Sequence, residues 1–283
     1  KHGFDCAVVF HARPSTATLP IAVCATTRSI HFHGHKDKNR HSTVEIPGKG
    51  TVKPIVERDM DTVRALGGPK IPEGKMPTLY LSMPEITTWR ERLDRLGFRA
   101  PILGLGLGAS RPTKQWPMES YAAIAHAWVK KTGGSVVAVA APSEEELGRS
   151  FLTTVQTSGG AESSHLARIT ADTSLSARDL ARMLANTRVF LGNDSGPRHV
   201  AAALGIPTVT VFGPEDPFEW HPYERKQHPR FFIENLACRR DADHGMPPWC
   251  GLQVCDQPRL VCMRDTEVEP VLTTCLGFLE TGR

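Results

Sequence analysis

The fold is decided by the stretch Thr187-Arg-Val-Phe-Leu-Gly-Asn-Asp-Ser-Gly-Pro-Arg-His-Val200, because an apolar strand in it runs directly into a helix. Pro197 suits the first helical turn, and Ser195 or Gly196 can cap it. The free amides and the dipole of such a helix start attract anions, and a diphosphate fits them well. The alternative is an Asx turn that only joins a strand to a helix.

Two polar side chains of this stretch need separate interpretations. A carboxylate beside a phosphate is repelled, so Asp194 is expected to accept hydrogen bonds from sugar hydroxyls or to pin the loop backbone. His199 lies one turn into the helix, where it can donate to a phosphate oxygen or act as a structural histidine with partners of its own. The sequence leaves both interpretations of His199 open.

The same order of strand and helix repeats around this stretch. Continuous apolar runs such as Val136-Val-Ala-Val-Ala140 are typical of strands buried on both faces, which indicates a parallel sheet with helices on both sides. Ligands of such doubly wound sheets bind outside the carboxyl ends of the strands. We predict strands at residues 100–106, 135–140, 188–192, 207–212 and 230–234, and helices at 117–131, 144–156, 175–186 and 197–204.

A shorter α/β segment precedes this pattern. We predict strands at residues 5–10 and 28–33 and a helix over 52–66. Ser82-Met-Pro-Glu85 resembles a capping box, and the helix that it opens ends at Gly97. A chain of 283 residues favours two domains, so we predict one Rossmann-like domain over residues 1–96 and a second over 97–283.

The first strand end of the second domain reads Gly104-Leu-Gly-Leu-Gly-Ala-Ser-Arg-Pro-Thr-Lys-Gln-Trp-Pro117. Its glycines match part of a dinucleotide fingerprint, but a helix cannot easily start before Pro117, and that motif needs an immediate helix start. Ser110, Arg111 and Lys114 are donors and cations with no acid among them, which suits phosphate. A solvated loop is the alternative.

Two other strand ends carry acids. Glu144 follows the strand at 135–140 and could bind the two hydroxyls of a ribose, although acids in a first helical turn also simply stabilise the helix dipole. Phe212-Gly-Pro-Glu-Asp-Pro-Phe-Glu-Trp220 is rich in turn formers and could wall a binding cleft or form a rigid loop.

Composition narrows the possible partners. The net charge of +4 is spread along the chain, too diffuse for nucleic acid. The longest apolar stretch is interrupted by Gly205 and Pro207 and is too short to span a bilayer. Asp241-Ala-Asp243 has the pattern of a cation-binding pair, but it lies in an irregular tail, so we expect no metal there.

The chain holds seven cysteines, which we expect to be in a reducing compartment. Four of them cluster, with eleven, four and six intervening residues and no CxxC knuckle. This spacing favours free thiols or a disulfide and leaves a zinc site as the alternative. The four are Cys238, Cys250, Cys255 and Cys262.

Three strings resemble glycosyltransferase family nine, the ADP-heptose:lipopolysaccharide heptosyltransferases and their relatives. They are Lys114-Gln-Trp-Pro117, Gly192-Asn-Asp-Ser-Gly-Pro-Arg-His-Val-Ala-Ala-Ala-Leu-Gly205 and Pro207-Thr-Val-Thr-Val-Phe-Gly-Pro-Glu-Asp-Pro217. The resemblance extends over residues 97–283, and residues 1–96 resemble the later part of the family's N-terminal domain. It implies an α/β chain of GT-B fold, with two Rossmann-like doubly wound domains that face a cleft, the first incomplete.

The resemblance also implies an activity: inverting, metal-independent transfer of heptose from ADP-heptose to a lipid-linked lipopolysaccharide core, with no cofactor, in the cytoplasm at the inner membrane. Lys114 matches the family lysine that contacts phosphate and sugar, and Ser110 matches a hydroxyl residue at the phosphates. Asp194 matches an acid at the sugar, residues 195–197 (Ser195, Gly196, Pro197) match the pyrophosphate-binding turn, and Glu144 matches the ribose acid.

The family's general base is expected on an Asp in an N-terminal glycine-rich loop. We find no such segment before Asp5, so we expect a truncated start and an inactive fragment, with His11 as a local alternative base. Three rivals stay open: a transferase of the same fold that uses another nucleotide sugar, a non-catalytic nucleotide-binding relative, and a Rossmann dehydrogenase.

Overall fold

The computed structural model describes residues 3–12, 22–32, 41–47, 53–68, 76–158, 168–239, 250 and 252–280. Contacts divide these residues into two compact units. The first unit holds the described residues up to Met76 together with Asp216–Pro222, and the second holds the rest.

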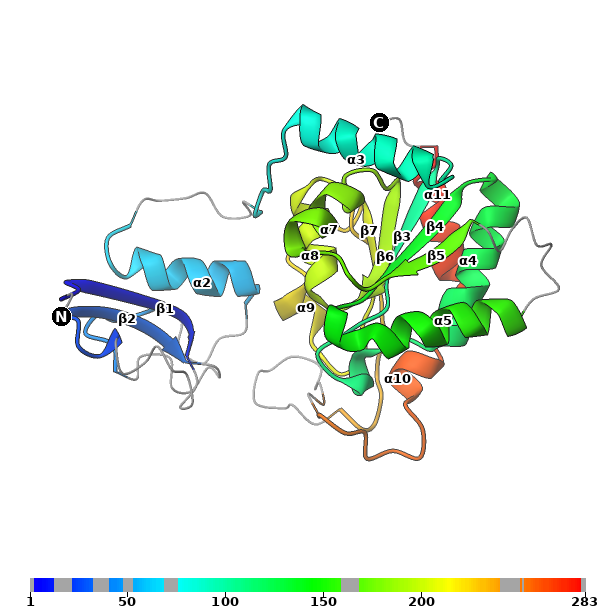
Figure 1. Cartoon of the computed structure of the whole chain (residues 1–283). Helices are drawn as coiled ribbons and strands as arrows, with labels where there is room; N and C mark the ends of the chain where they lie inside the picture. The colour runs from blue at the N-terminus through cyan, green and yellow to red at the C-terminus, as the bar shows by residue number, and fades with distance from the viewer. Residues whose placement is uncertain are drawn as a thin grey trace. The chain divides into compact units, whose positions relative to one another are not determined.

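The first unit is a small parallel α/β assembly. Strands β1 (Cys6–Ala12) and β2 (Thr27–Phe32) pair in parallel, and α2 (Ile55–Arg64) packs on both (Figure 1). Ile30 is fully buried at its centre. Parallel strands need a crossover connection, so this arrangement agrees with the predicted Rossmann-like character of the segment.

The second unit is built on six parallel strands in the order β5-β4-β3-β6-β7-β8. The chain runs outward from β3 to β4 and β5, and then returns to β6 on the other side of β3. The carboxyl ends of β3 and β6 therefore form the topological switch point, where doubly wound sheets bind their ligands. The strands are β3 (Ile102–Gly106), β4 (Ser135–Val139), β5 (Ile169–Asp172), β6 (Val189–Asn193), β7 (Thr208–Val211) and β8 (Arg230–Phe231).

Helices cover both faces of this sheet (Figure 1). Alternate side chains of one strand belong to different cores: Leu103 and Leu105 to one, Ile102 to the other. This burial on both faces is the reason for the continuous apolar runs in the sequence. One face carries α4 (Met118–Thr132), α5 (Glu145–Thr157) and α11 (Val268–Gly277), and the other carries α3 (Met83–Arg95), α7 (Ala177–Leu184) and α8 (Gly196–Ala203).

The predicted strands and helices are confirmed, with ends that shift by a few residues. The capping box is also confirmed, because the Ser82 amide donates to Glu85 Oε2 over 3.1 Å. Strand β5, the short helices α9 (Pro217–Trp220) and α10 (Val261–Arg264), and α11 were not predicted.

The predicted boundary between residues 96 and 97 differs from the division by contacts. Helix α3 packs against α7, so the contacts of the described residues divide the chain after Met76. The assignment of domains over 1–96 and 97–283 stays a prediction. None of the helices that the structure describes has the length and the apolar composition of a membrane span.

Candidate functional site

Asn193, the last residue of β6, ties the two strand ends of the switch point together. Its side-chain oxygen accepts from the Trp116 amide over 2.9 Å, and its side-chain nitrogen donates to the Leu107 carbonyl over 2.9 Å. Asn193 is fully buried. It therefore holds the loop after β3 beside the start of α8.

Asp194 lies between two cations at this point. Lys114 Nζ is 2.5 Å from Asp194 Oδ2, and Arg198 Nη2 pairs with the other oxygen, Oδ1. Lys114 ends the 3₁₀ turn Pro112–Lys114, and Arg198 lies four residues after Asp194 in α8. The side chain of Arg198 has no exposed surface, and its guanidinium carbon lies 5.1 Å from the centre of the Phe212 ring.

These contacts determine the charge of Asp194. Burial alone would raise the pKa of this carboxyl, but Arg198 and Lys114 outweigh it, so the pKa lies below its ordinary value. Asp194 is therefore ionised at neutral pH and unsuited to accept a proton as a general base. Lys114, Arg198 and Asp194 together have a net charge of +1.

His199 is held by an aromatic neighbour. Its Nδ1 bonds to the Tyr223 hydroxyl, and the Tyr223 ring lies 5.2 Å from the ring of His228, which bonds to Thr208 Oγ1 over 2.9 Å. Burial and the nearby Arg198 lower the pKa of His199 to about 3. The imidazole is therefore neutral, which favours the structural interpretation over a charged contact with phosphate.

The start of α8 is the predicted phosphate-binding turn. Ser195 is its N-cap and Gly196 its first residue, and Gly196 is exposed while Ser195 and Pro197 are half-buried. The Ser195 hydroxyl lies 3.5 Å from the Asn193 carbonyl and, among the described residues, caps no amide of the first turn. A ligand could therefore reach the amides of this turn.

The structure also brings the other predicted side chains to this edge of the sheet. Arg111 pairs with Glu215, which follows β7, and Ser110 is exposed on the same loop. The carboxylate of Glu144 lies against Gly108, because a Cβ added to Gly108 would lie only 2.1 Å from Oε2 of Glu144. All nine predicted ligand-binding residues belong to the second unit.

The glycines of the apparent dinucleotide fingerprint have a packing role. A Cβ on Gly104 or Gly106 would lie 2.9 or 2.7 Å from the Phe190 ring of the adjacent strand. The helix that follows begins only at Met118, after the 3₁₀ turn. The arrangement lacks the immediate helix start of a dinucleotide site, which weakens the dehydrogenase interpretation.

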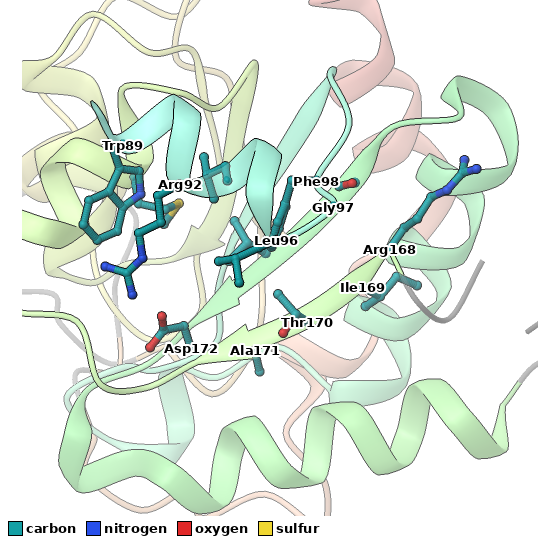
Figure 2. Close-up of a pocket in the computed structure, with 14 residues that line it drawn as sticks. Trp89, Arg92, Leu96, Gly97, Phe98, Arg168, Ile169, Thr170, Ala171 and Asp172 are labelled. Carbon is teal, nitrogen blue, oxygen red and sulfur yellow. The ribbon is translucent and has the colours of Figure 1, made fainter. Parts of the chain in front are cut away.

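A cavity of ≈ 320 Å³ lies elsewhere in the second unit, between α3 and the edge strand β5. Figure 2 shows Trp89 and Arg92 on α3 at the end of the cavity where Asp172 lies, and Arg168 at the opposite end of β5. None of the predicted ligand-binding residues lines this cavity. We therefore assign the candidate site to the switch point, because the charged and polar residues predicted to bind a ligand lie there and not around this cavity.

The cysteine cluster lies near the loop after β3. Cys238, Cys250, Cys255 and Cys262 are free thiols, and all four line one small cavity together with Thr113. Burial raises the pKa of the Cys262 thiol to about 11. Over the part of the chain that the structure covers, no group of three or more His, Cys, Asp or Glu is arranged to hold a metal ion. The Asp241-Ala-Asp243 pattern lies outside the described residues.

Comparison with known proteins assigns the family. A family model described as glycosyltransferase family 9 (heptosyltransferase) matches residues 4–245. The chain belongs to glycosyltransferase family 9. Lipopolysaccharide heptosyltransferase 2 of Escherichia coli K12 is 32% identical over 132 residues, which is 46% of this chain and 36% of that enzyme. The match thus spans about a third of this family 9 relative.

Solved structures of family 9 confirm the predicted GT-B fold class. The family 9 glycosyl transferase of Veillonella parvula has a TM-score of 0.72 at 17% identity, over 99% of this chain and 75% of that one. The ADP-heptose heptosyltransferase II of Escherichia coli has a TM-score of 0.64 at 18% identity, over 96% and 77%. Another Escherichia coli heptosyltransferase, solved with ADP-2-deoxy-2-fluoro heptose, has a TM-score of 0.53 at 19% identity, over 87% and 69%.

Sequence reasoning did not assign four residues that shape this site. Asn193 binds the Trp116 amide, and Arg198 pairs with Asp194. Glu215 pairs with Arg111, and Tyr223 bonds to His199. For Arg198 a signal was available, because residues four apart at a helix start can pair. The partners of Arg111 and His199 come from segments that are distant in the sequence, so local spacing cannot predict these pairs.

Proposed function

We propose that this family 9 chain is an inverting, metal-independent glycosyltransferase that takes heptose from ADP-heptose. The observation that carries the proposal is the juxtaposition of Lys114, Arg111 and the start of α8 at the carboxyl ends of β3 and β6. Cations and free amides at this position suit a diphosphate. The solved heptosyltransferase with ADP-2-deoxy-2-fluoro heptose supports the same donor class.

The mechanism follows from where charge develops. The leaving group is a nucleoside diphosphate, and negative charge grows on it as the glycosidic bond breaks. Lys114, Arg111 and the amides of α8 would stabilise this charge without a metal ion. Ser110 would donate to a phosphate oxygen, and Glu144 would accept hydrogen bonds from the ribose.

The acceptor hydroxyl needs a general base other than Asp194, which is ionised but held by two cations. We place the base in the N-terminal domain, as the family resemblance implies. That the chain lacks it stays a prediction, and the family model matches from residue 4 onward. The side chain of His11, the alternative, lies outside the described residues.

The acceptor in this proposal is a lipid-linked lipopolysaccharide core, because the curated relatives are named lipopolysaccharide heptosyltransferases. The protein would then work in the cytoplasm and touch the inner membrane only at its surface. A transferase of the same fold with another nucleotide sugar is the second candidate, since no described residue has been shown to read the base.

The proposal is tested by calorimetric titration of ADP, UDP, GDP and NADH into the chain, with and without Mg²⁺. We expect metal-independent binding of ADP that Lys114→Ala weakens by about tenfold or more, because a charge-assisted contact is lost. Lys131→Ala, at an exposed lysine near the end of α4, is the matched control and should leave the affinity unchanged. Tighter binding of UDP or GDP would change the donor, and binding of NADH alone would refute the mechanism.

A further inference from the structure

A carboxylate in a diphosphate site raises an electrostatic question. Asp194 sits at the start of α8, where the proposed donor places its phosphates, and it binds the Lys114 ammonium directly. An ionised carboxylate repels a diphosphate and competes with it for Lys114. If Asp194 had no other cation, donor binding would leave a buried negative charge without compensation.

We propose that Arg198 is the internal counter-ion of Asp194, which allows Lys114 to leave the carboxylate and bind the diphosphate of the donor. This inference rests on the proposed function. Arg198 acts through Asp194 and is therefore a positioning residue.

The geometry separates the two cations. Lys114 binds Oδ2 of the carboxylate and Arg198 binds Oδ1, so one can leave without breaking the bond of the other. The exposed fraction of the side chain is 12% for Lys114 and 0% for Arg198. Lys114 is thus the cation that a ligand can reach, and Arg198 is shielded from it.

The surroundings of Arg198 fix its position. Its guanidinium stacks over the Phe212 ring, at the carboxyl end of β7, and its backbone belongs to the first turns of α8. A planar guanidinium that stacks on a ring and binds a carboxylate has little freedom to move. When Lys114 turns to the diphosphate, Asp194 and Arg198 remain as a neutral pair.

This arrangement explains how an acid can remain in an anion site. With Arg198 in place, Asp194 keeps one neutralised oxygen, and Oδ2 becomes available to a sugar hydroxyl once Lys114 has moved. Without Arg198, the single cation Lys114 would have to neutralise both the carboxylate and the diphosphate. The affinity for a nucleoside diphosphate should then fall.

The test is calorimetric titration of ADP into the chain and its variants, each shown to be folded by circular dichroism. Arg198→Met keeps the length of the side chain and removes its charge, and we expect it to weaken ADP binding by about tenfold. Asp194→Asn introduced into the same protein removes the charge that Arg198 neutralised. We expect the double variant to recover most of the lost affinity.

If Arg198 acts only by holding the start of α8 in place, Asp194→Asn would not replace that support, and the affinity for ADP would not recover in the double variant. Wild-type affinity in Arg198→Met, or a double variant as weak as Arg198→Met, would overturn the inference. If Arg198→Met does not fold, Arg198→Gln, which also removes the charge but keeps a polar side chain, takes its place with the same expected and contradicting results. A wild-type chain that binds no nucleoside diphosphate would refute the proposed function itself.

Discussion

Replacement of Arg198 by Ala is expected to destabilise the second unit far more than removal of an exposed ion pair. Removing one partner of a buried pair costs about 3–5 kcal/mol, because it leaves the other charge without compensation. Asp194 would keep Lys114, so the lower end applies, about 3 kcal/mol. Loss of the cation–π contact with Phe212 adds about 2 kcal/mol, the magnitude for a contact that is shielded from water.

Urea unfolding followed by tryptophan fluorescence measures this loss, because Trp116 and Trp128 are buried in the second unit. The matched control is Arg149→Ala, because Arg149 pairs with Glu145 and Glu146 and its side chain is 60% exposed. That variant should change the free energy of unfolding by less than about 0.5 kcal/mol. If the two variants differ by less than about 1 kcal/mol, the account of a buried, stabilising Arg198 is refuted.

Three other predictions concern pH, packing and metal. In the folded chain the pKa of His199 is lowered to about 3 and that of His228 to about 4, whereas the ordinary pKa of histidine is 6.5. Below pH 6.5 the unfolded chain therefore binds more protons than the folded chain. The free energy of unfolding should therefore fall as the pH drops below about 6.5, by up to about 1.4 kcal/mol for each pH unit and each of the two histidines. A midpoint of urea unfolding that does not change between pH 7.5 and pH 5 would contradict this. Gly106→Ala places a Cβ 2.7 Å from Phe190 and should cost about 1–3 kcal/mol in thermal unfolding, whereas Gly277→Ala, with open space around it, should cost less than about 0.5 kcal/mol; equal costs would refute the packing role. Chelation by EDTA should leave the affinity for ADP within about twofold, because the proposed mechanism uses cations of the protein in place of a metal ion; a lost affinity would show that a metal takes part.

The sheet could be predicted because its strands are buried on both faces. Val189, Phe190 and Leu191 form a continuous apolar run, and the structure sends alternate side chains to the two cores. Strand β5 lies at the edge of the sheet and buries only Ile169, so it lacks such a run. In α11 the buried residues Val271, Leu272 and Cys275 do follow a helical spacing, and that signal was present in the sequence.

The sequence could predict that the candidate site residues follow strand ends, but it could not predict how they pair. The sequence places Asp194 and Lys114 after different strands, and both strand ends reach the switch point because β3 and β6 are neighbours. The ion pair between them depends on that topology. The bond from His199 to Tyr223 and the pair of Arg111 with Glu215 likewise depend on loops from distant segments, which periodicity cannot locate.

A crystal structure of the whole chain with ADP bound would show directly whether the diphosphate lies at the switch point of the second unit. We expect a diphosphate on the amides at the start of α8 and within hydrogen-bond distance of Lys114 Nζ, with Arg198 still paired to Asp194. A diphosphate in the cavity beneath α3, or one at the switch point that Lys114 does not touch, would contradict this expectation.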